Sequence, residues 1–121
     1  MAEKMQLICA SNVLRDGGKG VRFICEAEER THPAFVIRYQ GKIHAYLNRC
    51  AHMGLELDWM EGEFFDDSGV YLICASHGAT YQPATGFCVA GPCRGASLER
   101  LAVEEKNGKV YFLTKGLKHG G

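Results

Sequence analysis

The chain contains two matching stretches, Cys50-Ala51-His52-Met53-Gly54 and Cys74-Ala75-Ser76-His77-Gly78, with 21 residues between His52 and Cys74. Each stretch, here called an arm, offers one cysteine and one histidine and ends in glycine. Thiolate and imidazole groups that converge on one point are ligands of a transition-metal centre. A glycine after a ligand lets the backbone turn tightly around a cofactor that a Cβ would crowd. Because the chain has only five histidines, the repeated order predicts a metal site formed by Cys50, His52, Cys74 and His77.

The two arms resemble those of Rieske proteins, in which a Cys-x-His and a Cys-x-x-His motif hold a [2Fe-2S] cluster. The resemblance assigns Cys50 and Cys74 to one iron and His52 and His77 to the other. It continues past the arms through the middle of the chain, at Leu57, Gly78, Tyr81, Thr85-Gly86 and Gly91-Pro92. It implies one [2Fe-2S] cluster, with electrons entering and leaving through the imidazole edges.

The arms also bear on the reduction potential. Exchanging two thiolates for neutral imidazoles removes negative charge and raises the potential of an iron-sulfur cluster. High-potential members of the resembling family have a serine directly after His-Gly and a tyrosine two residues later, both hydrogen-bonded to cluster sulfurs. This chain has Ala79 and Tyr81 there. With one donor absent, and with the six acids of residues 56–67 opposing an added electron, we expect a potential in the lower part of the roughly −150 to +300 mV Rieske range.

Zinc is the alternative metal. A single Zn²⁺ is equally satisfied by two sulfur and two nitrogen ligands in a tetrahedron. Structural zinc sites, however, usually pair cysteine with cysteine and histidine with histidine on each knuckle. The mixed arms favour iron and sulfide, and colour distinguishes the two because an iron-sulfur protein is brown.

Short apolar runs separated by turn residues predict an all-β chain with few helices. The expected strands cover 5–9, 21–26, 34–39, 42–47, 70–74, 100–105 and 109–114. Asn107-Gly108 is typical of a two-residue hairpin, because a type I′ turn requires positive φ at both central residues. Gln40-Gly41 predicts a second hairpin, and the glycines of residues 17–20 predict a flexible loop.

A chain of 121 residues is long enough for one hydrophobic core. We expect one Rieske-like domain with a base, an antiparallel sandwich or barrel, made of 1–47 and 96–115. Residues 48–95 form an inserted cluster-binding lobe, and 116–121 form a tail. The N-terminus does not resemble a signal peptide, and no run approaches the ~20 apolar residues that cross a bilayer. The expectation is a soluble, cytoplasmic protein without a membrane segment.

Four cysteines lie outside the arms, at Cys9, Cys25, Cys88 and Cys93. Respiratory-type Rieske domains brace their arms with a disulfide, whose positions are here Leu55 and Ser76, so this bridge cannot form. The four are expected to be small core residues or shielded thiols. Cys88 and Cys93 flank the Gly91-Pro92 turn, and a disulfide between them or a place beside the cluster is the alternative.

Charge is unevenly distributed along a chain of zero net charge. No lysine or arginine lies between Cys50 and Cys93, which leaves the rest of the chain at a formal +6. This segment has six acids, Glu56, Asp58, Glu61, Glu63, Asp66 and Asp67. They form either a solvated loop or a surface that steers the cluster toward a basic docking surface on a redox partner. Nucleic-acid binding is disfavoured, since no basic stripe accompanies exposed aromatics.

Three further residues have structural interpretations. Trp59 is expected to plug the core beneath the acidic segment, with a docking anchor as the alternative. His32 and His44 have no cysteine or histidine at a ligand spacing and are expected to be exposed strand or turn residues.

The sequence shows no Ser-His-Asp order, phosphate-binding loop or paired catalytic carboxylates, so no catalytic residue is assigned. The leading hypothesis is a soluble Rieske-type ferredoxin, an electron carrier between a reductase and a terminal oxygenase or similar enzyme. The alternatives are a tightly bound small subunit of a multisubunit reductase, similar to those of nitrite reductases, and a zinc-stabilised interaction module.

Overall fold

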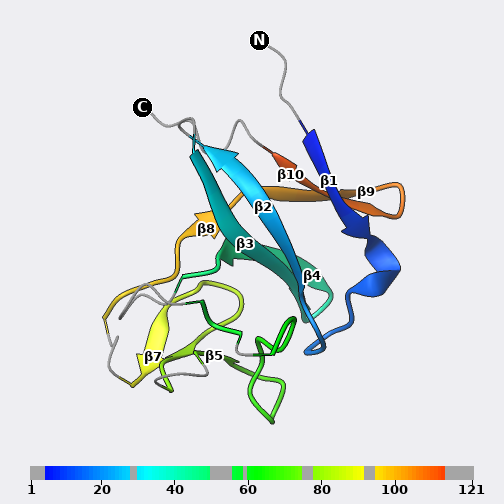
Figure 1. Ribbon diagram of the computed structural model, residues 1–121. Helices are drawn as coiled ribbons and strands as arrows, with labels where there is room; N and C mark the ends of the chain where they lie inside the picture. The colour runs from blue at the N-terminus through cyan, green and yellow to red at the C-terminus, as the bar shows by residue number, and fades with distance from the viewer. Residues whose placement is uncertain are drawn as a thin grey trace.

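The computed structural model of the chain describes residues 5–27, 30–49, 56–58, 60–74, 78–91 and 95–113. These residues form three antiparallel sheets, and their one helical segment is the 3-10 turn at Ser11–Val13. The predicted all-β class is confirmed. Strands β1 and β10 lie at one end of the molecule, and β5 and β7 lie at the other (Figure 1).

The strands fall into three groups. The first sheet has the order β1 (Met5–Ala10), β10 (Lys109–Leu113) and β9 (Val103–Lys106). The second has the order β2 (Val21–Ala27), β3 (Arg30–Tyr39), β4 (Lys42–Leu47) and β8 (Arg100–Leu101). The third contains β5 (Leu72–Ile73), β6 (Thr80–Tyr81) and β7 (Cys88–Ala90). The first two sheets use both ends of the chain and the third uses the middle. The exact division into base, lobe and tail remains a prediction.

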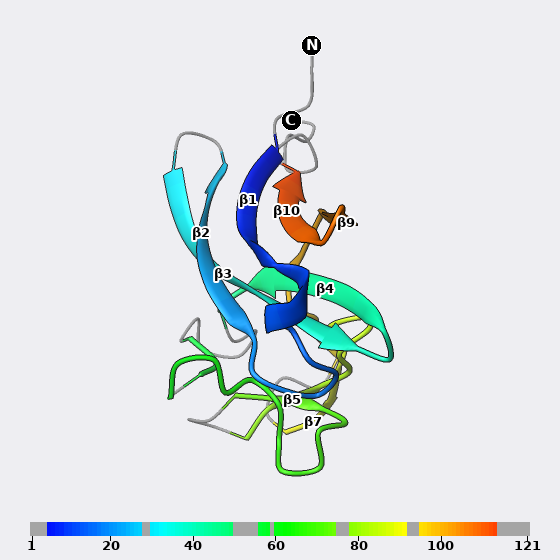
Figure 2. The ribbon, with the colours of Figure 1, turned by 90° about the vertical axis from the view of Figure 1, so that its right-hand side faces the viewer.

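Both predicted hairpins are confirmed. The β3–β4 turn has φ of 53° at Gln40 and 81° at Gly41, and the β9–β10 turn has 51° at Asn107 and 77° at Gly108. Positive φ at both central residues matches the right-handed twist of the flanking strands. Strands β1 and β10 lie side by side (Figure 2), and their antiparallel register pairs Met5 with Leu113.

Some strands differ from the prediction. The run 100–105 divides at Ala102, because β8 pairs with β4 in one sheet while β9 pairs with β10 in another. The run 70–74 contributes only Leu72–Ile73. Strands β6 and β7 were not predicted, since two or three residues are too few to show an alternating pattern.

Strand β3 is buried on both faces. Ala34 and Val36 belong to one hydrophobic cluster, with residues of the first sheet such as Phe112. Phe35 and Ile37 point the other way, as alternating strand residues do, into a second cluster that reaches the third sheet. The second cluster joins the third sheet to the base.

The loop at 17–20 is packed against its neighbours through Gly20, and its predicted flexibility stays a prediction. A Cβ at Gly20 would lie 2.7 Å from Ile37 Cγ2 and 2.8 Å from Phe64 Cδ2. The Gly20 amide donates to the Gly62 carbonyl at 2.9 Å. Glycine is required here because the loop passes directly over the second cluster.

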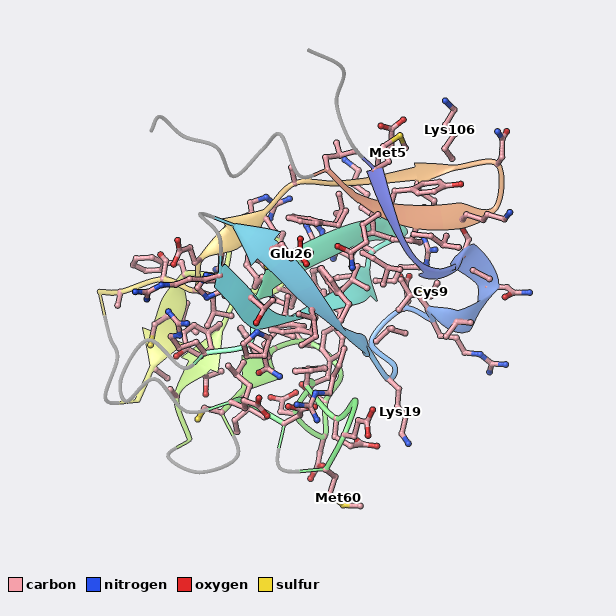
Figure 3. All side chains as sticks on the ribbon, turned by 45° about the horizontal axis from the view of Figure 1, so that its top comes forward. Met5, Cys9, Lys19, Glu26, Met60 and Lys106 are labelled. Carbon is pink, nitrogen blue, oxygen red and sulfur yellow. The ribbon has the colours of Figure 1, made fainter. Side chains whose placement is uncertain are left out.

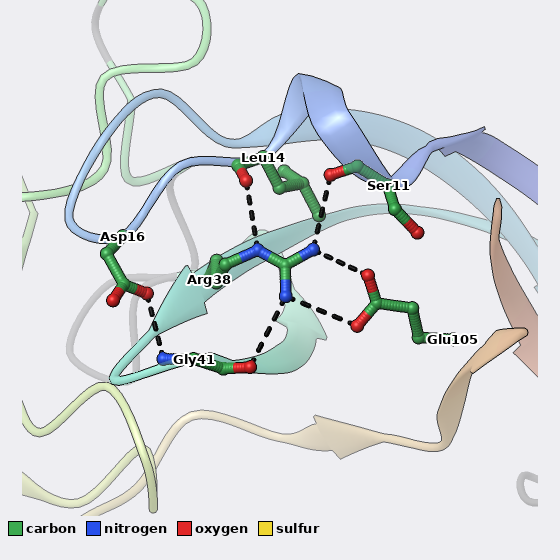
Figure 4. A network of polar contacts seen from close by, with 6 residues as sticks. All are labelled: Ser11, Leu14, Asp16, Arg38, Gly41 and Glu105. Carbon is green, nitrogen blue, oxygen red and sulfur yellow. Dashed lines mark hydrogen bonds and ion pairs between the residues drawn. The ribbon is translucent and has the colours of Figure 1, made fainter. Parts of the chain in front are cut away.

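Arg38 links β3 to two other elements (Figure 4). Its guanidinium donates to the carbonyls of Leu14 at 2.9 Å and Ser11 at 3.2 Å. It also donates to the two carboxylate oxygens of Glu105 on β9, at 2.6 and 3.2 Å. The two-pronged contact fixes β9 against β3.

No helix in the described part of the chain has the length and apolar content needed to pass through a membrane.

Replacing Glu105 by glutamine should lower the free energy of unfolding by about 1 kcal/mol at pH 7. The hydrogen bond from Arg38 lowers the pKa of Glu105 below its ordinary 4.5. The stabilisation is therefore complete above the unfolded-state pKa and is lost as pH falls through the folded-state pKa. Urea unfolding of both proteins at pH 7 and pH 3 should show the difference narrowing in acid. The exposed neighbour Glu104→Gln is the control, and an equal difference at both pH values would contradict the assignment.

Candidate metal centre

The second arm begins where β5 ends. Cys74 is fully buried. Its backbone N–H donates to the Ala79 carbonyl at 2.8 Å, and its own carbonyl accepts from the Gly78 N–H at 2.8 Å. These two bonds close the loop 74–79 at its neck. Gly78 has φ of +74°, and a Cβ there would meet no described atom within 4 Å, so backbone conformation requires the glycine.

The first arm leaves β4 through Asn48 and returns at Leu57. Asn48 is only 1% exposed. Its side-chain oxygen accepts from the Leu57 N–H at 2.8 Å, so the residues on either side of segment 49–56, which contains this arm, lie side by side.

The residues at which both arms join the rest of the fold lie in one hydrophobic core. Leu57, Cys74, Ala79 and Tyr81 all belong to the second hydrophobic cluster and are fully buried. Cysteine and histidine donors from two arms with a common root suit a centre bound by sulfur and nitrogen. Of the five predicted site residues, the structure places Cys74 and Tyr81 in this core. Cys50, His52 and His77 lie outside the described residues, as do Leu55, Ser76 and Trp59.

A third segment contacts the second arm. Strand β7 pairs with β6 and leads to Gly91, which has φ of +94°. A Cβ at Gly91 would lie 2.9 Å from Ala79 Cα and 3.1 Å from the Gly78 carbonyl oxygen. The backbone at Gly91 therefore rests directly on the second arm, at a distance that only glycine allows.

The remaining cysteines are in different states. Cys25 is fully buried and Cys9 is half-buried, and burial raises the pKa of both thiols. Both match the predicted shielded thiols. Cys88 is buried and takes part in a disulfide. Cys93 lies outside the described residues, so a bond between it and Cys88 remains a prediction.

Tyr81 and Ala79 occupy the positions considered for hydrogen bonding to the cluster. Tyr81 lies on β6 opposite Leu72 and Cys88 and is fully buried. Ala79 is fully buried too and has no hydroxyl to donate. The bond from Tyr81 to a cysteine sulfur remains a prediction.

A polar network fastens the third sheet to the base. The Tyr46 hydroxyl donates to the Pro83 carbonyl at 2.6 Å. Arg100 donates to the Tyr46 hydroxyl at 3.0 Å, the Ala84 carbonyl at 2.9 Å and Nδ1 of His44 at 3.1 Å. The turn between β6 and β7 is thereby held against β4 and β8.

The prediction that His44 is exposed was wrong. His44 is 7% exposed because Arg100 covers it. Burial and the positive charge of Arg100 lower its pKa, which keeps the imidazole neutral and able to accept. Burial raises the pKa of Tyr46 to about 12. Residues i and i+2 of a strand point to the same face, so His44 and Tyr46 share one face of β4. This alternation in the sequence could have indicated that His44 is buried. His32 is partly exposed and lies 3.4 Å from Arg49.

The acidic segment is less charged than the sequence suggested. Glu56 pairs with Arg22 at 2.8 Å, and Glu63 approaches Lys19 at 3.8 Å. Asp58 is buried, 3.7 Å from Arg22. The basic partners come from the base, and Lys19 lies on the same side of the molecule as Met60 in Figure 3. Lys19 and Arg22 therefore offset two of the six negative charges, with Arg22 shared by Glu56 and Asp58. The sequence could not show this because both cations precede these acids by more than thirty residues.

Comparison with known proteins identifies the family. Residues 4–111 match the family model described as "Rieske [2Fe-2S] domain". The chain belongs to the Rieske family. The cofactor of this family is one [2Fe-2S] cluster, which confirms the predicted cofactor and leaves the zinc alternative without support. The protein is 33% identical over 78 residues to oxidoreductase NdmD of Pseudomonas putida, a stretch that is 59% of this chain and 12% of that protein.

Solved structures share the fold of this Rieske chain. The Sphingomonas yanoikuyae B1 ferredoxin superposes with a TM-score of 0.69 at 23% identity, over 91% of this chain and 98% of that one. A chain from the complex of reduced oxygenase and oxidised ferredoxin in carbazole 1,9a-dioxygenase gives 0.70 at 24%, over 94% and 95%. The ferredoxin of carbazole 1,9a-dioxygenase from Nocardioides aromaticivorans IC177 gives 0.67 at 17%, over 90% and 96%.

Gly91→Ala should destabilise the protein far more than Gly95→Ala. Both glycines have nearly the same positive φ, +94° and +92°, but a Cβ at Gly95 meets nothing within 4 Å. The conformational cost, about 1–2 kcal/mol, is therefore common to both variants. Contact with Ala79 should add about 1–3 kcal/mol to the loss in unfolding free energy for Gly91→Ala alone. Chemical denaturation measures both values, and equal losses would show that Gly91 does not press on the second arm.

Proposed function

We propose that Cys50 and Cys74 bind one iron of the cluster and that His52 and His77 bind the other. The burial of Cys74 and the shared core beneath both arms support this assignment. Tyr81, on the strand that follows the second arm, is proposed to bind the cofactor by donating to a cysteine sulfur. When bound, the cluster supplies reversible one-electron transfer at a potential raised by its two neutral imidazoles.

The function that the site supports best is electron transport. The protein would carry one electron from a reductase to a terminal oxygenase or a similar enzyme, as a component of an oxidoreductase system and not as a catalyst by itself. The observation that carries this proposal is the match of its fold to 98% of the Sphingomonas ferredoxin chain. A structural relative was solved as a complex of oxygenase and ferredoxin, which supports an oxygenase as the acceptor.

The docking surface is proposed to be acidic and its partner's surface basic. Glu61 and Asp67 are exposed, and neither has an ion-pair partner among the described residues. The ion pairs of Glu56 and Glu63 are partly exposed to solvent, and exposed ion pairs are weak. Attraction by these carboxylates would speed association and fade with salt. The proposed location is the cytoplasm, whose reducing conditions suit the thiols of Cys9 and Cys25, whereas the disulfide of Cys88 counts against it.

An electron paramagnetic resonance spectrum of the dithionite-reduced protein tests the ligand assignment. Iron and sulfide analysis should give two of each per chain, as the cluster formula requires. His77→Ala and His52→Ala should each abolish the signal of the mixed-ligand cluster, because each removes a ligand of one iron. His32→Ala is the matched control and should keep the full signal. A persistent signal in the first two variants would mean that other residues bind the iron.

A tightly bound subunit is the second candidate function. It is favoured by the relationship to oxidoreductase NdmD, because the matching stretch is only 12% of that protein. A comparable domain therefore exists as part of a larger oxidoreductase, and this chain would play the same part as a separate subunit of a reductase.

Size-exclusion chromatography of cell extract separates the two candidates. A carrier should elute alone at its own mass, whereas a subunit should elute with its enzyme. For a carrier, the rate of electron delivery to the acceptor should fall several-fold as salt rises from low to physiological strength. Glu61→Gln combined with Asp67→Asn should weaken that salt dependence, and Glu104→Gln should not. If the double variant leaves the salt dependence unchanged, the proposed acidic docking surface is wrong.

A further inference from the structure

A buried polar pair lies at the neck of the first arm. Asn48 is 1% exposed and Asp58 is 6% exposed, with the carboxylate itself fully covered. The Asn48 side-chain amide donates to one carboxylate oxygen of Asp58 at 3.0 Å. The other oxygen accepts from the Gly62 N–H at 3.0 Å. Neither side chain is among the proposed ligands.

The pair ties the residues on either side of segment 49–56, which contains the first arm, to the rest of the fold. Asn48 precedes the segment 49–56, its backbone N–H donates to Pro33 on β3 at 2.8 Å, and its side-chain oxygen holds Leu57 at the far end. Asp58 then ties that far end to the turn at Gly62, which itself packs on Gly20 of the base. The ends of the arm are thus held at one separation by hydrogen bonds from side chains.

The donor and acceptor pattern of this pair allows one arrangement. The side-chain oxygen of Asn48 must face the Leu57 N–H and its amide nitrogen must face Asp58, because each buried polar group needs a partner. Asp58 must offer two acceptors, one to Asn48 and one to Gly62. Among the described residues, the neck of the second arm is closed by the two backbone bonds between Cys74 and residues 78 and 79, with one added bond from the Thr80 hydroxyl to the Gly78 carbonyl at 3.0 Å. The ends of the first arm's segment, in contrast, are joined directly by a side chain, that of Asn48.

We propose that Asn48 and Asp58 are positioning residues for the cluster, which fix the ends of the first arm so that Cys50 and His52 meet it correctly. The inference rests on the proposed ligand assignment. Groups that orient metal ligands from behind typically change metal affinity about 10–100-fold when removed. The pair holds the ligand-bearing segment as a whole instead of a single ligand.

An exchange of the two side chains tests the proposal. Asn48→Asp places a carboxylate oxygen against Asp58, and Asp58→Asn turns an amide group toward either the Gly62 N–H or the Asn48 amide. Each single variant breaks one hydrogen bond. The double variant restores these hydrogen bonds, although it moves the carboxylate that lies 3.7 Å from Arg22 Nε from position 58 to position 48. Its carboxylate at position 48 accepts from the Leu57 N–H and from the amide at position 58, and the oxygen of that amide accepts from the Gly62 N–H.

The readouts are the rate at which an iron chelator bleaches the folded, cluster-loaded protein and the electron paramagnetic resonance spectrum after reduction. Each single variant should lose its cluster about tenfold faster than the natural protein and show a shifted spectrum. The double variant should return to within a factor of about three. Where Asn48→Asp does not fold, Asp58→Asn and the double variant decide the question.

Glu105→Gln is the control, because it weakens the polar contact between Glu105 and Arg38 in the base and leaves the contacts of Asn48 and Asp58 intact. It should lower stability yet leave the bleaching rate and the spectrum of the folded protein unchanged. Natural bleaching rates and spectra in the single variants would overturn the proposal, as would single variants that are not rescued by the exchange. A natural protein without a mixed-ligand cluster signal would instead overturn the proposed function.

Discussion

The burial of β3 on both faces is the constraint on which the remaining structure depends. Its alternate residues fill two separate cores, and Phe35 stacks on Phe64 with ring centroids 3.9 Å apart. A slip of one residue in the pairing of β3 with β2 or β4 would exchange the two sets of side chains. One strand therefore sets both the closure of the base and the place where the segment between β4 and β8 can pack.

That constraint reaches the metal centre through packing and not through a long chain of polar contacts. Leu57 and Cys74 lie in the same core as Phe35, so the roots of the two arms are fixed by hydrophobic contact with the base. Polar groups then refine the geometry locally. The Tyr46 hydroxyl holds Pro83, and Asn48 holds Leu57. The contacts that fix each arm therefore lie at the residues where that arm joins the rest of the fold.

Sequence reasoning could predict what depends on local pattern. The hairpins at Gln40-Gly41 and Asn107-Gly108 follow from the backbone conformations that those residues tolerate, and the arms follow from ligand chemistry. Strands β6 and β7 could not be predicted, because two or three residues become strands only when the second arm returns the chain beside β5. His44 was misplaced because its cover, Arg100, is 56 residues away. Three predicted ligands, Cys50, His52 and His77, lie outside the described residues and remain proposals.

The structure also changes the balance of effects behind the expected low reduction potential. Two were invoked from the sequence, the absent hydroxyl at Ala79 and the negative charge of six acids. Arg22 and Lys19 now oppose the charge of Glu56, Asp58 and Glu63, and exposed carboxylates are screened by solvent and salt over about 10 Å. Ala79 is buried at the neck of the second arm, where the absence of a donor is not compensated by solvent. Hydrogen bonding to the sulfurs, more than surface charge, is therefore the term by which this chain would set its potential.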